Sequence, residues 1–167
     1  RNPVKVPFGA GMIAQMSKEV PANARVLVTY GGGSVKTTGT LDEVKAALGE
    51  RHIIEFGGIE PNPSFETLMQ AVELGRRENA DYIVAVGGGS VMDGSKFIAA
   101  AIHHDGEPMD ILKTRGRAVT QALPLGVVVT LAATGSETNS GAVVTIRETH
   151  SKMAFSNPLL YPQFAVM

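Results

Sequence analysis

The chain has 167 residues, of which 44% are hydrophobic and 19% are charged, values typical of one globular domain. Lys and Arg number 15 against 16 Asp and Glu, so no broad basic surface indicates a nucleic-acid partner. No apolar run is long enough to span a bilayer, no signal-peptide pattern occurs, and the absence of cysteine excludes disulfides and thiolate metal sites. We therefore expect a cytoplasmic protein with no membrane partner.

The predicted elements alternate between strands and helices along most of the chain. In the first half of the chain, we expect strands over 4–11, 24–30, 52–58 and 81–86. Helices are expected from the first strand to about residue 20, over 40–49, within 60–80 and over 91–104. Further on, we expect a strand over 123–134, a hairpin from 141–148 and 152–157, and a last strand over 163–167. Ser64 is expected to cap the helix that follows it.

This alternation predicts βαβ units, in which buried parallel strands are joined by helices. The expected fold class is therefore α/β: a Rossmann-like, mostly parallel sheet with helices on both faces and a small β-hairpin near the C-terminal end. The chain starts at Arg1 without an initiating Met and ends in the apolar run "PQFAVM". We expect that it is part of a longer protein.

The motif Gly-Gly-Gly-Ser-Val occurs twice, at 31–35 and 87–91, each time directly after a predicted strand. A helix that follows such a turn presents free backbone N–H groups and a partial positive charge, and glycine lets a phosphate approach closely. The second copy fits neither the strict dinucleotide spacing nor the P-loop spacing, and a single glycine run after a strand is more often only a tight turn. Two turns at one edge of a parallel sheet favour a dinucleotide, or another ligand with two separated anionic or ribose groups.

A polar loop follows the strand predicted over 123–134. The segment "TLAATGSETNSGA" gathers hydroxyl groups, including those of Thr130, Thr134 and Ser136, which could hold ribose, phosphate or a carboxamide. A solvated turn is the alternative. Asp93 could be a helix-dipole partner or a contact for a ribose or substrate hydroxyl, and Lys152 a surface charge or a cofactor contact. The four His residues form no metal-ligand pattern.

Three segments together, "VAVGGGSVMDGSKFIAA", "TLAATGSETNSGAVV" and "FGGIEPNP", resemble the iron-containing (group III) alcohol dehydrogenases. The resemblance is strongest to the branch of NADPH-dependent aldehyde reductases and butanol dehydrogenases. It implies that residues 1–167 form the N-terminal dinucleotide-binding domain, of the kind also found in dehydroquinate synthase. The helical C-terminal domain, in which an Asp and three His hold a divalent iron or zinc ion, would lie outside this chain. The isolated chain would then be inactive.

The resemblance also implies which residues contact the cofactor. The pyrophosphate would lie on Gly87, Gly88, Gly89 and Ser90. The nicotinamide and its ribose would lie near Asp93, Thr130, Thr134 and Ser136, and Lys152 would match a cofactor-contacting lysine of the family. No catalytic or metal-ligating residue is expected within this chain.

The first glycine turn is expected to contact the ribose of adenosine. Members of the family that prefer NAD often carry an acidic residue after this strand, whereas this chain has Gly31, Gly32, Ser34 and Lys36. Backbone N–H groups, a hydroxyl and a cation suit a 2′-phosphate, so we predict NADP(H) rather than NAD(H).

The resemblance implies an activity, hydride transfer between NADP(H) and a small aldehyde or alcohol, and a homodimeric protein. Two alternatives stay open from the sequence. The chain could be the cofactor domain of a glycerol dehydrogenase or of a dehydroquinate synthase-like lyase, or it could be a nucleotide-binding module with no chemistry of its own.

Overall fold

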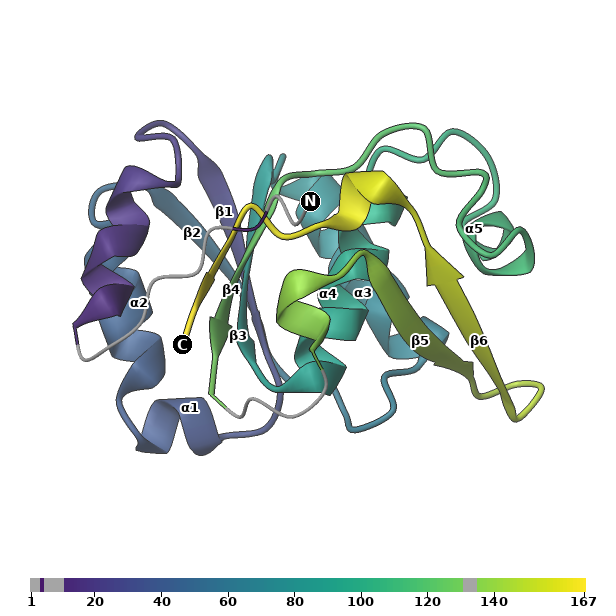
Figure 1. Ribbon diagram of the computed structural model, residues 1–167, viewed down its shortest axis with the longest axis horizontal. Coiled ribbons are helices and arrows are strands. Elements are labelled where there is room, and N and C mark those ends of the chain that lie inside the picture. The colour runs from purple at the N-terminus through teal and green to yellow at the C-terminus, as the bar shows by residue number, and fades with distance from the viewer. Residues whose placement is uncertain (1–3, 5–10, 131–134) are drawn as a thin grey trace.

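A five-stranded parallel sheet forms the centre of the molecule (Figure 1). The computed structural model describes Val4, residues 11–130 and residues 135–167. The strands are β1 (Arg25–Tyr30), β2 (His52–Phe56), β3 (Tyr82–Gly87), β4 (Leu125–Val129) and β7 (Phe164–Val166). Their order across the sheet is β2–β1–β3–β4–β7, and every neighbouring pair is parallel.

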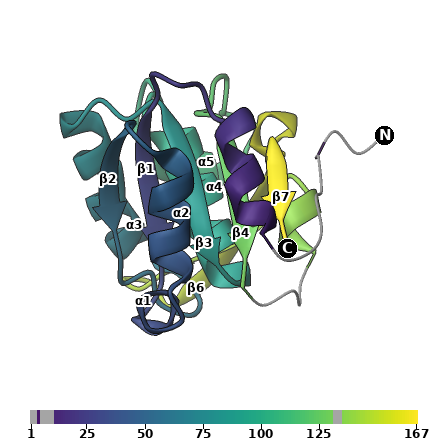
Figure 2. The same ribbon diagram turned by 90° about the vertical axis from the view of Figure 1, so that its left-hand side faces the viewer.

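Helices cover both faces of this sheet, as Figures 1 and 2 show. One face carries the 3₁₀ helix η1 (Met12–Lys18) and helices α1 (Ser34–Thr37) and α2 (Thr40–Leu48). The other carries α3 (Phe65–Arg77), α4 (Gly89–Ala101), α5 (Met109–Lys113) and an antiparallel hairpin of β5 (Gly141–Ile146) and β6 (Ser151–Ser156). Two short 3₁₀ helices, η2 (Ser136–Thr138) and η3 (Pro158–Leu160), precede and follow the hairpin.

The central strands are apolar on both faces because both faces are covered. Along β1, Val26 and Val28 pack on the α2 side, whereas Leu27 between them packs on the α3 and α4 side. The sheet therefore separates two hydrophobic cores, and the expected α/β architecture with its small hairpin is confirmed. Within the described ranges, no helix is both long enough and apolar enough to cross a membrane.

Several boundaries differ from those expected from the sequence. The helix expected to run to about residue 20 is a 3₁₀ helix that buries only Met16 fully. The strand expected over 123–134 is β4, which ends at Val129, and residues 131–134 lie outside the described residues. Most of the strand expected over 4–11 also lies outside them. The short helices α1 and α5 were not expected.

The N-cap of α3 is the one expected. Ser64 is buried, and its Oγ accepts a hydrogen bond from the backbone N–H of Thr67 at 3.2 Å. Because this bond satisfies a helix N–H that has no partner within the helix, Ser64→Ala should lower the free energy of unfolding by about 1 kcal/mol. Chemical denaturation measures this loss. Ser17→Ala, which removes an exposed hydroxyl, is the control and should stay within about 0.5 kcal/mol of the parent; equal effects would contradict the cap.

Candidate functional site

The two Gly-Gly-Gly-Ser turns lie side by side at one edge of the sheet. β1 and β3 are neighbouring parallel strands, and Tyr30 is in register with Val86, so Gly31 and Gly87 follow at the same level. The chain leaves β1 towards β2 on one side of this pair and leaves β3 towards β4 on the other. In open α/β sheets, the carboxyl edge at such a reversal is the usual place for ligands. The expected convergence of the two turns is confirmed.

A groove of about 570 Å³ lies between the two turns. Its wall contains eight of the residues expected to contact a cofactor: Gly31, Gly32, Ser34, Gly87, Gly88, Gly89, Ser90 and Thr130. Val35, Thr38, Ile59, Pro61, Val86 and Val91 complete the lining. The groove is therefore walled mainly by backbone, small hydroxyl side chains and apolar groups, as a phosphate- and ribose-bearing ligand requires.

Local packing explains why glycine is needed at two of these positions. A Cβ on Gly87 would lie 2.7 Å from Cγ2 of Val91, and a Cβ on Gly31 would lie 3.1 Å from the carbonyl oxygen of Ile59. Gly32 is different, because a Cβ there would meet no atom within 4 Å. The absence of a side chain at Gly31 and Gly87 thus lets Ile59 and Val91 pack closely against these turns. The open space beside Gly32 would instead accept a side chain.

The N-terminus of α4 opens onto the groove. Gly88 occupies the N-cap position and makes no side-chain cap, so the first N–H groups of this 13-residue helix are available to a ligand. The helix dipole favours an anion at the same place. Ser90 Oγ accepts a hydrogen bond from the backbone N–H of Asn62 at 3.3 Å, which fixes the hydroxyl at the rim. These features fit the pyrophosphate of a dinucleotide.

Lys36 lies beside the first turn and is not among the groove-lining residues. Its Nζ is 5.4 Å from the centre of the Tyr30 ring, a cation–π arrangement. The nearby carboxylate of Glu55 pairs with Lys45 at 2.7 Å, and this hydrogen bond raises the pKa of Lys45. Glu55 thus pairs with Lys45, whereas Lys36 stands over the Tyr30 ring.

Asp93 and Ser136 meet at a second cavity of about 640 Å³. Asp93 accepts hydrogen bonds from Ser136 Oγ at 2.9 Å and from the backbone N–H of Val143 at 3.1 Å. Burial raises the pKa of the Asp93 carboxyl above its usual value, although both hydrogen bonds oppose this shift. The structure thus brings these two expected residues together beside the hairpin, in a cavity separate from the groove between the glycine turns.

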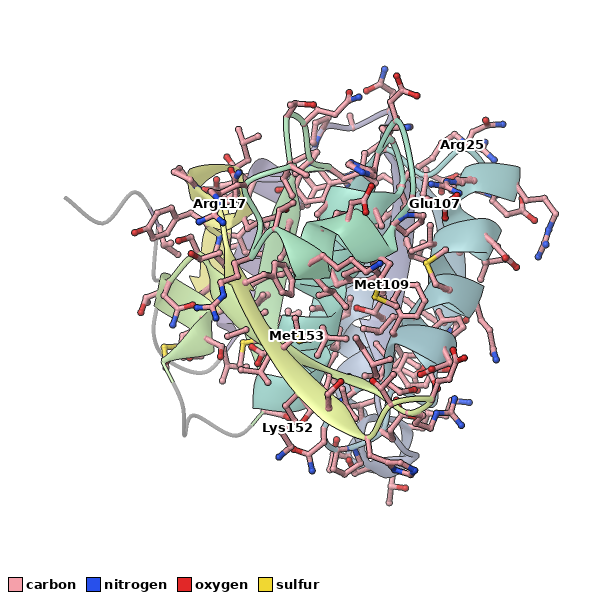
Figure 3. All side chains as sticks on the ribbon, turned by 90° about the vertical axis from the view of Figure 1, so that its right-hand side faces the viewer. Arg25, Glu107, Met109, Arg117, Lys152 and Met153 are labelled. Carbon is pink, nitrogen blue, oxygen red and sulfur yellow. The ribbon has the colours of Figure 1, made fainter. Side chains whose placement is uncertain are left out.

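Of the last two expected contacts, Lys152 and Thr134, the structure describes only Lys152. Lys152 stands near the beginning of β6, as Figure 3 shows, and does not line either cavity. Its Nζ donates to Oδ1 of Asn62 at 3.4 Å, and Asn62 in turn contacts Ser90, so Lys152 is linked to the groove rim through one residue. Thr134 lies outside the described residues.

Lys96 is a site residue that sequence reasoning missed. Its side chain is fully buried, and Nζ donates to the carbonyl oxygens of Ser136 and Gly141 at 2.7 and 2.9 Å and to Oδ1 of Asn139 at 2.9 Å. Burial lowers its pKa to about 8, against the attraction of Asp93 and Glu137. The signal in the sequence was a lone lysine directly before the apolar run "FIAAAI" of α4.

The described part of the chain offers no cluster for a metal ion. No three His, Cys, Asp or Glu side chains gather there. A catalytic divalent ion needs about three protein ligands at one centre, so the described residues do not fit the metal that the family resemblance implies.

Comparison with known proteins agrees with the geometry. The family described as iron-containing alcohol dehydrogenase matches residues 3–167. The NADPH-dependent aldehyde reductase YqhD of Escherichia coli is 52% identical over 168 residues, and a probable NADH-dependent butanol dehydrogenase of Bacillus subtilis is 43% identical over 169; each match covers 99% of this chain.

Solved structures give the same result. A crystal structure of Escherichia coli YqhD superposes with a TM-score of 0.98 at 51% identity and covers 100% of this chain. The NADH-dependent butanol dehydrogenase A of Thermotoga maritima has a TM-score of 0.93 at 35% identity and covers 99%. The chain spans 43% of the length of the two curated relatives, and 43% and 42% of these two structures. By its sequence and its fold, the chain belongs to the iron-containing alcohol dehydrogenase family.

Proposed function

We propose that this chain is the cofactor-binding domain of a metal-dependent oxidoreductase that transfers hydride between NADP(H) and a small aldehyde or alcohol. One observation carries the proposal: the two Gly-Gly-Gly-Ser turns form opposite walls of one groove at the β1–β3 edge. The divalent ion, iron or zinc, would be held by other parts of the whole protein. Relatives more than twice as long as this chain support that division.

The cofactor would extend from the first turn, past the second, towards the Asp93–Ser136 pair. The N–H groups at Gly88 and Gly89 and the Ser90 hydroxyl would hold the pyrophosphate at the N-terminus of α4. Thr130 would contact the ribose that bears nicotinamide. Thr134 and Lys152 are still predicted to contact the same end of the cofactor. When bound, the nicotinamide supplies the hydride, and the chain's task is to hold and orient it.

The preference for NADP(H) rests on the first turn. The relatives are named for NADPH in one case and NADH in others, so they support a nicotinamide cofactor without choosing between the two. None of the described residues that line the groove carries a carboxylate, and Lys36 stands beside it. A 2′-phosphate would meet N–H groups and a cation there, and no carboxylate among the described lining residues would repel it.

Calorimetric titration of the full-length protein with NADPH and NADH tests this proposal. We expect NADPH to bind at least about tenfold more tightly, a difference of about 1.4 kcal/mol. Metal-dependent oxidation of NADPH by short aldehydes should accompany binding. A binding module would bind the cofactor without turnover, and a lyase would not consume NADPH. The names of the relatives support the oxidoreductase. The homodimer and the cytoplasmic location stay predictions, the former measurable by size-exclusion chromatography.

Lys36→Gln should weaken NADPH binding about fivefold and leave NADH binding within about twofold. The reason is the loss of one cation near the 2′-phosphate, worth about 1 kcal/mol at an exposed site. Lys45→Gln is the matched control, because that lysine is engaged by Glu55 and should affect neither cofactor. Equal losses for NADPH and NADH in Lys36→Gln would contradict a role in recognising the phosphate. Fluorescence titration measures both constants.

A further inference from the structure

The ammonium of Lys96 connects α4 to a single distant segment of the chain. All three of its acceptors lie within residues 136–141, two of them backbone carbonyls and one the side chain of Asn139. Lys has three N–H donors and no acceptor, so the protonated group is fully satisfied by this segment. Burying a charge this completely is costly without such partners. The arrangement therefore indicates a specific task rather than a surface charge that happens to be covered.

The same segment also carries one side of the Asp93–Ser136 pair. Asp93 lies one turn before Lys96 on α4 and accepts from Ser136 Oγ and from Val143 N–H. Asp93 and Lys96 thus hold residues 136–143 at several points through charge-assisted hydrogen bonds. The charged groups that act on Lys96 are Asp93 on α4 and Glu137 on η2, whereas its contacts from Asn139 and from Gly141 of β5 are neutral.

We propose that Lys96 is a positioning residue whose ammonium holds residues 136–141 against α4, and so fixes Ser136 and Asp93 for the nicotinamide end of the cofactor. This inference rests on the proposed cofactor site, because it takes the Asp93–Ser136 cavity as the place of the nicotinamide. Lys96 itself lines neither cavity and acts through the segment that it holds.

The charge state of Lys96 gives the proposal a signature in pH. With a pKa of about 8, the ammonium is lost in mildly alkaline solution, and the neutral amine has two donors for three buried acceptors. Loosening of the segment should raise the dissociation constants of NADPH and NADH alike, about fivefold between pH 7.5 and 9.5. Both cofactors should respond because they share the nicotinamide end.

The titration of Lys96 should not lower the free energy of unfolding between pH 7.5 and 9.5. The folded-state pKa of Lys96 lies below its ordinary value of 10.5, so between about pH 8 and 10.5 the unfolded chain binds more protons at this residue. The contribution of Lys96 to the free energy of unfolding therefore rises with pH there. A purely structural role predicts no alkaline loss of affinity, whereas a positioning role predicts one.

Titration of NADPH and NADH into the full-length protein at several pH values tests the proposal, with Lys96→Met and Asn139→Asp as variants. Lys96→Met should bind both cofactors about fivefold more weakly at pH 7.5 and show no alkaline loss. Asn139→Asp keeps both acceptor roles of residue 139, towards Lys96 Nζ and Gly141 N–H, and adds a negative charge. It should raise the pKa of Lys96 and move the loss of affinity to higher pH.

Amide hydrogen exchange adds a readout that does not depend on the cofactor. Exchange at residues 136–141 should be faster in Lys96→Met than in the parent protein at pH 7.5, while strands β1 and β3 stay protected. If Lys96→Met does not fold, the shift in Asn139→Asp still decides the question. Affinity that is constant from pH 7.5 to 9.5, or an alkaline loss that Asn139→Asp does not move, would overturn the role of Lys96. Failure of the parent protein to bind either cofactor at pH 7.5 would instead overturn the proposed function.

Discussion

Gly32→Asp is expected to weaken NADPH binding about 30-fold while leaving NADH binding within about twofold, which reverses the preference proposed here. The new carboxylate would stand at the first turn, where the 2′-phosphate of NADPH is proposed to bind. Two negative groups placed together cost about 2 kcal/mol at a partly exposed site, which corresponds to this factor. NADH lacks that phosphate, and its free ribose hydroxyl donates a hydrogen bond to the new carboxylate.

The fold should tolerate this substitution. Gly32 is exposed, its φ lies outside the left-handed region, and a Cβ there meets no atom within 4 Å. Gly32→Asn has nearly the same shape without the charge, so it isolates electrostatics and should change NADPH affinity by less than about threefold. Fluorescence titration of both cofactors measures the result. If the Asn and Asp variants lose NADPH binding equally, the effect is steric and the phosphate does not lie at this turn.

Gly126→Ala should lower the free energy of unfolding by about 3 kcal/mol. Gly126 lies in β4, in register with Phe164 of β7, and a Cβ at this position would overlap the Phe164 ring. Both residues are buried in the sheet, so the ring cannot move away without displacing the core around it. For a domain of this size, the melting temperature should fall by about 10 °C.

A double-mutant cycle identifies the cause of that loss. Phe164→Leu removes most of the ring and should itself destabilise the protein by leaving a cavity. In the Phe164→Leu background, Gly126→Ala should cost less than about 1 kcal/mol, since the overlap is gone. Thermal unfolding of the four proteins measures the coupling. Strictly additive effects would mean that the ring is not what requires glycine in β4.

The elements that the sequence predicted well are those with a strong local pattern. β1 and β3 are almost uninterrupted runs of β-formers, and α2 places Leu41, Val44 and Leu48 on one stripe. α1 and α5 were missed because helices of four and five residues are too short to show a period. η1 was expected as an ordinary helix because one buried residue does not distinguish a 3₁₀ helix from an α-helix.

In the candidate site, too, the residues within a local motif were predicted and those joined by long-range contacts were not. The two glycine turns were recognisable because each is a contiguous motif after a strand, and parallel pairing places them together. The buried contacts of Lys96 join residues about 40 positions apart, so no local pattern reveals them. The position of Lys36 over the Tyr30 ring depends on local packing, so the sequence could not predict it, and its contact with a cofactor stays a prediction.

Five of the fourteen described residues that line the groove at the β1–β3 edge are glycines, which present only main chain to a ligand. An exposed, uncrowded glycine such as Gly32 is therefore a position at which a new side chain can change the choice of cofactor without disturbing the fold. Glycine and aspartate codons can differ by one base, so a lineage could exchange one cofactor for the other in a single mutational step. Descendants of one ancestral gene would then diverge in this trait while their architecture stayed the same.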